Sequence, residues 1–288
     1  MPDSYEGKTA VVTGGASGVG RCLCDRFAQA GMRVVMADVE APALEKSAGD
    51  LAARGYDVIG VEADVTSPES MAALEAEARR QFGKVHVLCN NAGVGIKEAQ
   101  RRVWSLTPKD WQWGFAVNVM GVANGIRAFV PNMLEHGENG HVVNTSSGNG
   151  GLTSMPTTPI YASSKAAVTS LSEVLHYQFL MESAALQAHV LFPGPHLVNT
   201  NILSSMRNRP DELRDDNEPV AYTTMSDLAK ASGIKNMKLT EPEEVAEHCF
   251  DGMREGNFWI LPASRSGDAK LQQRTETILE RRNPALPK

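Results

Sequence analysis

Short apolar runs rich in β-branched residues alternate along this chain with longer segments in which apolar residues recur at helical spacing. The runs predict seven strands, at residues 9–13, 33–37, 57–62, 85–89, 140–145, 187–192 and 258–262. The longer segments predict helices over residues 18–30, 41–54, 68–82, 110–136 and 160–183, and a further helix that begins at Glu241. Strands that alternate with crossover helices are typical of a parallel sheet. We therefore expect an α/β fold of the Rossmann type: a doubly wound, seven-stranded parallel sheet flanked by helices.

No linker rich in proline, or in glycine and serine, interrupts this alternation, so residues 1–288 are predicted to form a single dinucleotide-binding and catalytic domain. Residues 196–240 are polar, mixed in charge and rich in methionine, which predicts a substrate lid of short helices. Residues 266–288 are predicted to be a C-terminal extension, with a helical pattern from Asp268 to Arg282. A doubly wound sheet binds its ligand at the carboxyl ends of the strands, near the point where the strand order reverses.

The turn after the first predicted strand is rich in glycine and reads Thr13-Gly14-Gly15-Ala16-Ser17-Gly18-Val19-Gly20. Glycine lets the backbone turn sharply and approach a pyrophosphate, and the following helix presents free N–H groups and the positive end of its dipole to that anion. A glycine-rich loop alone is weak evidence, but its place between a strand and a helix strengthens it. We expect contacts to a dinucleotide cofactor from Gly14, Ser17, Gly18, Val19 and Gly20.

Asp38 stands at the end of the second predicted strand, 18 residues after Gly20. An acid at roughly this offset binds the adenosine ribose hydroxyls of NAD. A carboxylate there also repels the additional phosphate of NADP, and the neighbouring Ser17 and Val39 are uncharged. The alternative is that Asp38 only caps a loop. The residues favour NAD over NADP as the cofactor.

Two more strand ends carry polar residues that fit the adenine side of a cofactor pocket. Asp64 and Val65 follow the third predicted strand, and Asn91, Ala92 and Gly93 follow the fourth. We expect all five residues to contact the cofactor. An Asn-Ala-Gly turn can equally tie strands together through its amide side chain. Asn91 is expected to do both, with the cofactor contact made mainly through its backbone.

Tyr161 and Lys165 lie four residues apart near the start of a long apolar helix, so the phenol and the ammonium share one helix face. A free tyrosine has a pKa of about 10, too high for efficient proton transfer at neutral pH. A nearby lysine cation, together with a positive nicotinamide ring, lowers this pKa. We expect Tyr161 to exchange a proton with the substrate oxygen, and Lys165 also to bind the nicotinamide ribose. A pair at this spacing is often only a surface feature.

Two further positions support a catalytic site. Ser146 and Ser147 end the fifth predicted strand, where a hydroxyl can hydrogen-bond the substrate oxygen and stabilise charge that develops on it. Ser147 is the preferred candidate and Ser146 is the alternative. Asn118 is a polar amide on a mostly apolar helix face. It either anchors a water that relays protons to Lys165 or is a satisfied core amide.

Composition and charge narrow the range of partners. The chain of 288 residues has a formal net charge of −6 and no long basic run, which argues against nucleic acid as a partner. No apolar stretch reaches the roughly 18 residues of a membrane helix, and the first residues lack the features of a signal peptide. The four cysteines and seven histidines show no metal-binding spacing, so we expect no metal, and reduced thiols in the cytoplasm. The expected partner is a small molecule.

Taken together, these residues resemble the short-chain dehydrogenase/reductase family in its single-domain branch. The matching positions occur in the family's order over about residues 7–200: Thr13-Gly14-xxx-Gly18-x-Gly20, Asp38, Asp64, Asn91-Ala92-Gly93, Asn118, Ser147, Tyr161-xxx-Lys165 and Pro193-Gly194. The resemblance implies a catalytic tetrad of Asn118, Ser147, Tyr161 and Lys165. It also implies NAD contacts from Tyr161, Lys165, Pro193 and Gly194, and contacts to the nicotinamide carboxamide from Val198 and Thr200.

The resemblance further implies an NAD-dependent oxidoreductase that moves a hydride between the cofactor and a secondary alcohol or ketone. The layout is similar to that of members acting on bulky aryl or alicyclic alcohols. Residues 195–197 look like a small insertion before Val198, and the C-terminal helix replaces a glycine-rich ending, so it could cover the substrate cleft or a partner subunit. Homodimer and homotetramer both stay open. The alternatives are a non-catalytic NAD-binding regulatory protein and an NAD-assisted epimerase or dehydratase.

Overall fold

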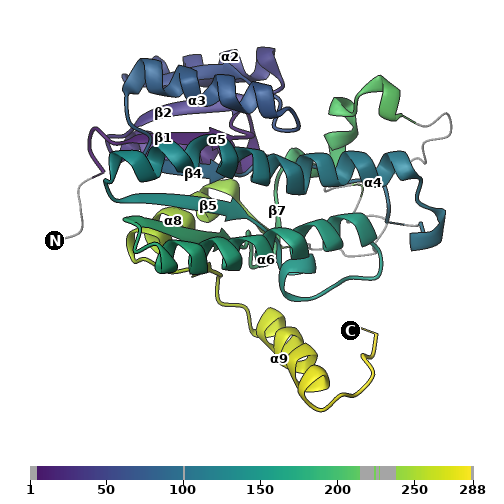
Figure 1. Ribbon diagram of the computed structural model, residues 1–288. Helices are drawn as coiled ribbons and strands as arrows, with labels where there is room; N and C mark the ends of the chain where they lie inside the picture. The colour runs from purple at the N-terminus through teal and green to yellow at the C-terminus, as the bar shows by residue number, and fades with distance from the viewer. Residues whose placement is uncertain (1–4, 100, 215–223, 225–226, 228–237, 287–288) are drawn as a thin grey trace.

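A parallel sheet of seven strands forms the centre of the structure, in the order β3-β2-β1-β4-β5-β6-β9. The computed structural model describes residues 5–286, apart from residue 100 and residues 215–223, 225–226 and 228–237. The sheet agrees with the doubly wound, seven-stranded fold expected from the sequence (Figure 1). Its strands are β1 (Thr9–Thr13), β2 (Arg33–Asp38), β3 (Val58–Glu62), β4 (Val87–Asn90), β5 (Gly140–Thr145), β6 (Leu186–Leu191) and β9 (Trp259–Ile260).

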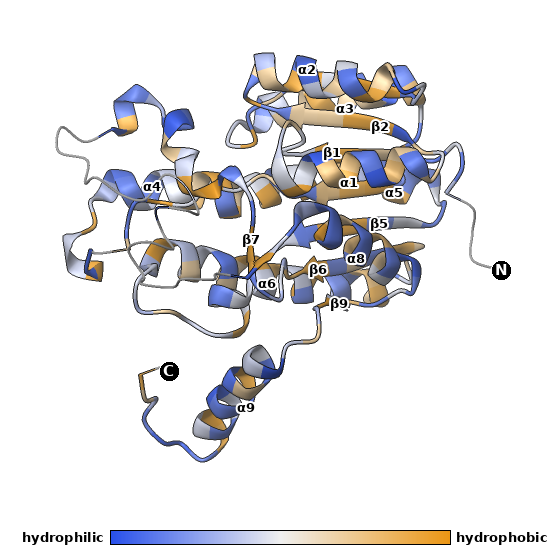
Figure 2. Ribbon diagram, turned by 180° about the vertical axis from the view of Figure 1, so that it is seen from behind, coloured by the Kyte–Doolittle hydropathy of each residue, from blue (hydrophilic) through white to orange (hydrophobic). Residues whose placement is uncertain are grey.

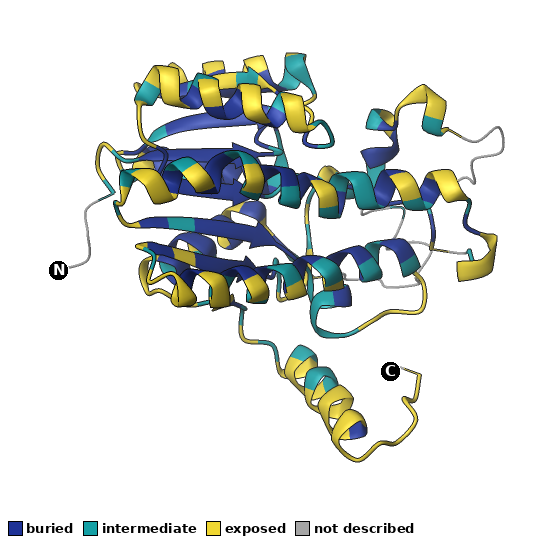
Figure 3. Cartoon of the chain, in the orientation of Figure 1, coloured by how far each residue is buried: buried dark blue, intermediate teal, exposed yellow. Residues whose placement is uncertain are grey.

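Helices cover both faces of this sheet. Apolar side chains of α1, α2 and α8 pack on one face, and those of α3, α5 and α6 pack on the other. Figure 2 shows hydrophobic strands between helices whose outer sides are hydrophilic, and Figure 3 shows the same division as burial. In the described part of the chain, no helix is both long and apolar enough to span a membrane. The helices are α1 (Gly18–Gln29), α2 (Ala41–Ala52), α3 (Pro68–Phe82), α4 (Pro108–Phe115), α5 (Gly121–His136), α6 (Pro159–Met181), α8 (Pro242–Arg254) and α9 (Arg265–Leu279).

The strand order reverses at β1. This strand pairs with β2 on one side and with β4 on the other, in both cases in parallel. After β1 the chain enters α1, which packs on one face of the sheet, whereas after β4 it proceeds to α5, which packs on the opposite face. The two connections diverge, so a crevice opens at the carboxyl ends of these strands.

The helix predicted over residues 110–136 is continuous but not uniform. It begins at Pro108, where Thr107 caps it in a reciprocal pair of hydrogen bonds with Asp110. Between α4 and α5 the chain forms a π-helical turn, η2 (Ala116–Met120), which contains Asn118. In a π turn the backbone hydrogen bonds join residues five positions apart instead of four. The side chains after the turn therefore point in other directions than regular α-helical spacing predicts.

The segment predicted as a lid contains the short helices expected of it and also a small sheet. The 3₁₀ helices are η4 (Asn201–Asn208) and η5 (Asp211–Leu213), and β7 (Leu197–Val198) pairs in parallel with β8 (Leu239–Thr240). The rest of this segment, at residues 215–223, 225–226 and 228–237, lies outside the described residues. The predicted C-terminal helix is α9, which begins and ends three residues earlier than its pattern indicated.

The contact between α5 and β4 can be tested at a glycine. A Cβ built at Gly125 of α5 lies 2.0 Å from Oδ1 of Asn90, whereas a Cβ at Gly49 of α2 meets nothing within 4 Å. We expect Gly125→Ala to lower the free energy of unfolding by about 1–3 kcal/mol, the usual cost of overpacking. Gly49→Ala should raise it by about 0.5–1 kcal/mol through helix propensity. Urea unfolding measures both changes, and equal stability of the two variants would contradict this packing.

Candidate active site

One large cavity occupies the crevice at the carboxyl ends of the strands. Its volume is about 630 Å³, and its lining runs from the β1–α1 turn to α9. All the residues predicted to form the site line this cavity, except Asn118 and Gly194. The structure therefore brings together the following predicted residues: Gly14, Ser17, Gly18, Val19, Gly20, Asp38, Asp64, Val65, Asn91, Ala92, Gly93, Ser147, Tyr161, Lys165, Pro193, Val198 and Thr200.

The glycine turn is built without room for side chains. Gly14 and Gly18 have φ angles of +68° and +53°, which favour glycine, and a Cβ at Gly20 would lie 2.0 Å from the carbonyl oxygen of Gly14. Helix α1 begins at Gly18, and the N-cap residue Ser17 makes no capping hydrogen bond through its side chain. The N-terminal end of α1 therefore faces the cavity with backbone donors that Ser17 does not satisfy.

Asp38 is fixed at the wall of the cavity beside this turn. Its Oδ2 accepts a hydrogen bond from the backbone N–H of Ala16 at 3.0 Å, and its Oδ1 accepts one from Glu40 at 3.1 Å. Arg207 and Asn208 of η4 also line the cavity, and the sequence did not identify them. Arg207 pairs with Glu40, and Asn208 donates to Glu40 at 2.8 Å. These bonds hold the pKa of Glu40 below its usual value, against the opposing effect of burial.

Asn91 ties β4 to β1 as its turn predicted. Its side-chain Nδ2 donates to the carbonyl oxygen of Thr13 at 3.0 Å, and Thr13 Oγ1 accepts from the backbone N–H groups of Asn91 and Ala92, each at 3.1 Å. The amide side chain is thus used within the protein. Asp64 follows β3 and bonds within its own loop, where its Oδ1 accepts two hydrogen bonds of 2.8 Å from Thr66.

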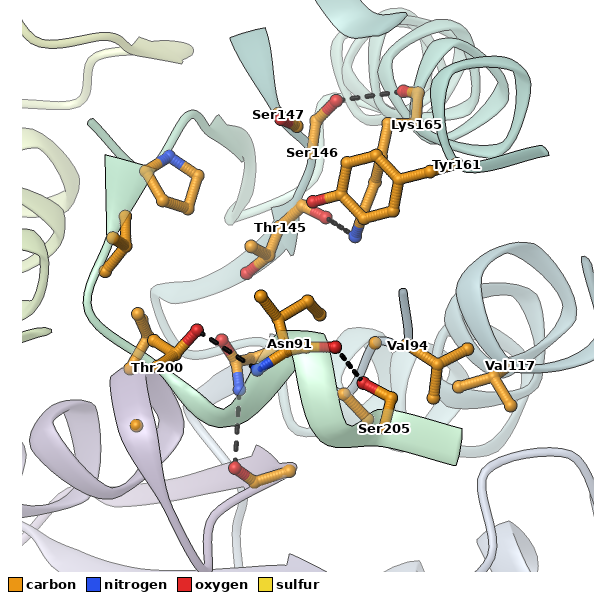
Figure 4. A pocket seen from close by; sticks show the side chains of 18 of the residues that line it. Asn91, Val94, Val117, Thr145, Ser146, Ser147, Tyr161, Lys165, Thr200 and Ser205 are labelled. Atoms are coloured by element: carbon orange, nitrogen blue, oxygen red, sulfur yellow. Dashed lines mark hydrogen bonds between the residues drawn. The ribbon is translucent and has the colours of Figure 1, made fainter. Parts of the chain in front are cut away.

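Tyr161, Lys165 and Ser147 meet on the opposite side of the cavity from Asp38. Tyr161 and Lys165 project from α6, with Lys165 Nζ 5.7 Å from the centre of the phenol ring (Figure 4). Lys165 Nζ donates to the carbonyl oxygen of Thr145 at 2.8 Å, at the end of β5. The residues that follow this strand bring Ser147 into the cavity near the phenol of Tyr161. Two secondary-structure elements, β5 and α6, therefore build this group.

Burial dominates the protonation of these side chains. It lowers the pKa of Lys165 to about 8, so Lys165 is a cation at neutral pH. Burial also raises the pKa of Tyr161, an effect that the nearby Ser147 hydroxyl only partly offsets. The sequence predicted a lowered pKa for Tyr161; in the protein alone the direction is opposite, because the prediction included a nicotinamide charge and omitted the desolvation of the phenol. Tyr161 is thus a protonated phenol at neutral pH.

The two candidate serines have different surroundings. Ser146 is buried, and its Oγ donates to the carbonyl oxygen of Lys165 at 2.9 Å and shares a 2.7 Å hydrogen bond with Thr169. Its hydroxyl therefore connects β5 to α6 within the core. Both serines line the cavity, but Ser147 is the one that lowers the pKa of Tyr161. The geometry favours Ser147 over Ser146.

Asn118 is a satisfied core amide rather than part of the cavity wall. Its Oδ1 accepts from the backbone N–H of Val94 at 2.8 Å, and its Nδ2 donates to the Val94 carbonyl at 3.1 Å and to Ser164 Oγ at 3.0 Å. Both donor hydrogens of the amide are used within the protein. Asn118 connects the loop after β4 to α6, the helix that carries Tyr161.

The turn after β6 also reaches the cavity. Thr200 lies against the glycine turn, since a Cβ built at Gly18 would be 3.2 Å from Thr200 Cγ2. Gly194 stands outside the lining, and the nearest atom to a Cβ built there is Cγ of Pro262, at 3.4 Å. The residues that resemble an insertion, 195–197, line the cavity themselves, which the sequence did not indicate.

Known proteins are similar to this chain in sequence and in fold. A family model described as short chain dehydrogenase matches residues 8–211. This chain belongs to that family. It is 32% identical to the C alpha-dehydrogenase of Sphingobium sp. (strain NBRC 103272 / SYK-6), over 90% of this chain and 81% of the relative. It is 28% identical to the CLA biosynthesis dehydrogenase/reductase of Lactiplantibacillus plantarum, over 89% and 88%. A short chain dehydrogenase/reductase from Burkholderia phymatum, solved in complex with NAD, matches with a TM-score of 0.89 and 38% identity over 98% of each chain.

This short-chain dehydrogenase holds its tyrosine in place through an acid that the sequence did not single out. Glu98 lies in the loop after β4 and is only 1% exposed. Its two carboxylate oxygens accept hydrogen bonds from the backbone N–H groups of Ile160 at 2.7 Å and Tyr161 at 2.9 Å. Burial raises the pKa of Glu98, and these two bonds oppose the rise. No periodic pattern includes Glu98, so only its contact across the fold identifies it.

A buried ion triad supports the same side of the dehydrogenase. Asp110 of α4 pairs with Arg101 at 2.7 Å and with Arg209 at 2.8 Å. Arg209 and Asp110 are almost fully buried, and the Arg209 guanidinium lies 5.7 Å from the ring of Trp113. These bonds hold the pKa of Asp110 below its usual value, although burial acts to raise it. The triad fixes the end of η4 against α4, which forms part of the cavity wall.

Removing Glu98 tests whether it fixes the start of α6. We expect Glu98→Ala to lower the free energy of unfolding by about 1–3 kcal/mol, because two amides at a buried helix end lose their acceptor. The matched control is Glu69→Ala, which removes an exposed acid from the first turn of α3 and should cost at most about 1 kcal/mol. Urea unfolding compares the two variants. If Glu98→Ala lowered the free energy of unfolding less than Glu69→Ala, the two hydrogen bonds of Glu98 would not stabilise α6.

Proposed function

We propose that this chain is an NAD-dependent oxidoreductase that transfers a hydride between the nicotinamide of NAD and a secondary alcohol or ketone. A single observation carries the proposal: one cavity joins the glycine turn and Asp38 at one end to Ser147, Tyr161 and Lys165 at the other. A dinucleotide needs an anion site, a ribose acceptor and a reacting centre within one elongated site. The catalytic residues are proposed to be Ser147, Tyr161 and Lys165, with Asn118 positioning them from the core.

The lining fits NAD. The glycine turn leaves backbone donors and the positive end of α1 facing the cavity, which suits a pyrophosphate. The Asp38 carboxylate suits ribose hydroxyls. Arg207 also lines the cavity, but its charge is paired with Glu40 and is not left for the additional phosphate of NADP. The Burkholderia phymatum relative was solved with NAD. We propose that the cavity residues predicted from the sequence hold this cofactor, with Gly194 shaping the turn from outside the lining.

The chain's own residues would manage the proton. When bound, NAD supplies the carbon that accepts or releases the hydride. Tyr161, a protonated phenol in the protein alone, can donate its proton to a ketone oxygen, and in the reverse direction it takes a proton from an alcohol. The Ser147 hydroxyl is placed to hydrogen-bond the same substrate oxygen. Lys165 is a cation beside the ring at neutral pH, and a cation there favours the phenolate that alcohol oxidation requires.

The substrate end suits a bulky aryl or alicyclic alcohol. Apolar side chains form much of its wall: Val94, Trp113, Val117, Leu152, Met155 and Ile202. Such walls favour an apolar ring through burial of its surface. The Sphingobium relative is named a C alpha-dehydrogenase. We further propose that the described residues 196–213 of the predicted lid form one side of this substrate site, and that α9 of the predicted C-terminal extension forms another.

We also propose a cytoplasmic homo-oligomer, either a dimer or a tetramer. All four cysteines are buried and free, as thiols are in a reducing compartment. On the outer side of α6, Val174, Tyr177, Leu180 and Met181 are exposed (Figure 3). Positions 174, 177 and 181 share one helix face, so together they form an apolar strip that a second subunit could cover.

The reaction is tested by removing the proposed proton donor. NADH formation from NAD and a panel of aryl and alicyclic secondary alcohols should fall at least about 100-fold in kcat/KM in Tyr161→Phe, because positioned proton transfer contributes that much. Tyr56→Phe, between α2 and β3 and outside the cavity lining, serves as the control and should keep full activity. Equal activity of Tyr161→Phe and the wild type would refute the mechanism. Protein that retains NAD but forms no NADH from any alcohol would favour the regulatory or epimerase alternatives.

The choice of NAD over NADP is tested at Asp38. In Asp38→Asn the charge that repels a ribose phosphate is lost, so the ratio of kcat/KM for NAD to that for NADP should fall about tenfold or more. The matched control is Glu62→Gln, which removes an exposed acid from the end of the adjacent strand β3 outside the cavity lining. Steady-state kinetics with both cofactors measures the ratio. An unchanged ratio in Asp38→Asn would show that another residue selects the cofactor.

A further inference from the structure

The charged residues of the cavity are unevenly distributed. Three acids line it, namely Asp38, Glu40 and Asp64, and all of them lie at or just beyond the ends of β2 and β3. Three cations line it too: Lys165, Arg207 and Lys270. Lys165 donates to the Thr145 carbonyl, and Arg207 pairs with Glu40. Within the described ranges, no carboxylate forms an ion pair with Lys270.

Lys270 reaches the cavity from α9, the helix outside the sheet layers in Figure 1. One turn further along this helix, Arg274 Nη1 donates to the carbonyl oxygen of Leu152 at 3.0 Å. Residues four apart share a helix face, so Lys270 and Arg274 point toward the same loop. Leu152 belongs to the loop that begins at Ser147, and both residues line the cavity. The anchor of α9 therefore places Lys270 on the substrate side rather than beside Asp38.

The surroundings of Lys270 would strengthen a charge interaction. The side chain is half-buried, and the loop to which α9 is anchored contributes Leu152 and Met155 to an apolar wall. An ion pair at a partly enclosed site is screened less by water than one on an open surface. A lysine is a compact charge on a flexible stem, able to reach a carboxylate whose exact position varies with the substrate.

We propose that Lys270 binds an anionic group of the substrate, so that this dehydrogenase acts preferentially on secondary alcohols that carry a carboxylate on the far side of the ring from the reacting carbon. The inference rests on the proposed function, since it assigns the substrate class of the same site. The apolar wall holds the ring, Ser147 and Tyr161 face the hydroxyl, and the C-terminal helix supplies the charge. The extension of the chain beyond β9 is thereby a specificity element.

The test compares an acid with its uncharged ester. The probes are 4-(1-hydroxyethyl)benzoate and its methyl ester, assayed with NAD. The ratio of kcat/KM for the acid to that for the ester should fall about tenfold in Lys270→Ala, mainly through KM, and further in Lys270→Glu, while Lys270→Arg should largely retain it. Arg265→Ala removes an exposed cation from the same helix outside the cavity lining and is the matched control. A ratio unchanged in Lys270→Ala would overturn the proposal.

A binding measurement separates this proposal from the reaction itself. Calorimetric titration of 4-acetylbenzoate and its methyl ester into wild type and Lys270→Ala, each in the presence of NAD, reports the anion preference without turnover, because neither the ketone nor NAD can release a hydride. Tighter binding of the acid that depends on Lys270, with no oxidation of either alcohol, would support the anion site and count against the proposed reaction. Equal binding of acid and ester by the wild type would overturn the anion site. A raised KM for NAD in Lys270→Ala with an unchanged acid-to-ester ratio would assign the charge to the cofactor phosphates instead.

Discussion

The position of β1 between β2 and β4 is the constraint on which the rest of the structure depends. The chain proceeds from β1 to β2 and from β4 to β5, in opposite directions along the sheet. Right-handed connections therefore place α1 and α5 on opposite faces, and neither connection fills the space between them. Thr13 and Asn91 bond across this point and hold the two strand ends together. The cavity, the exposed start of α1 and the approach of α6 from the far side all follow from that divergence.

Elements with short-range signatures could be predicted from the sequence. The glycine turn, Asp38 at a strand end, and the pair Tyr161 and Lys165 are encoded by spacing along one stretch of chain, and the structure brings them to one cavity. The side-chain role of Asn118 was left open, because it depends on what Val94 and Ser164 offer from other segments. No local sequence pattern identified Glu98 or Lys270. Glu98 bonds to the start of α6, about 60 residues later, and Lys270 enters the cavity from the C-terminal helix, so only the fold brings them to the site. The direction of the Tyr161 pKa shift was missed because burial is a property of the fold.

Buried charge is concentrated around the start of α6 and the facing part of α4. Glu98 satisfies two backbone amides, and Asp110 is held between Arg101 and Arg209. Buried ionic groups are costly to desolvate, so they stabilise a fold only when their partners are correctly placed. A loop, a helix and a 3₁₀ segment must therefore adopt one relative arrangement before these charges are satisfied. That arrangement is the one in which Tyr161 faces the cavity.

The stretch from Asn91 to Glu98 has a consequence for how the length of this chain can vary. Its first residue is bonded to β1, Val94 is bonded through both backbone groups to Asn118, and its last residue holds the start of α6. With three fixed points in eight positions, an inserted or deleted residue would shift at least one of these bonds out of register. The exposed positions that follow, from Arg102 to Ser105, carry no such ties to the sheet. Natural variation in length should therefore accumulate after Glu98 and spare the residues before it.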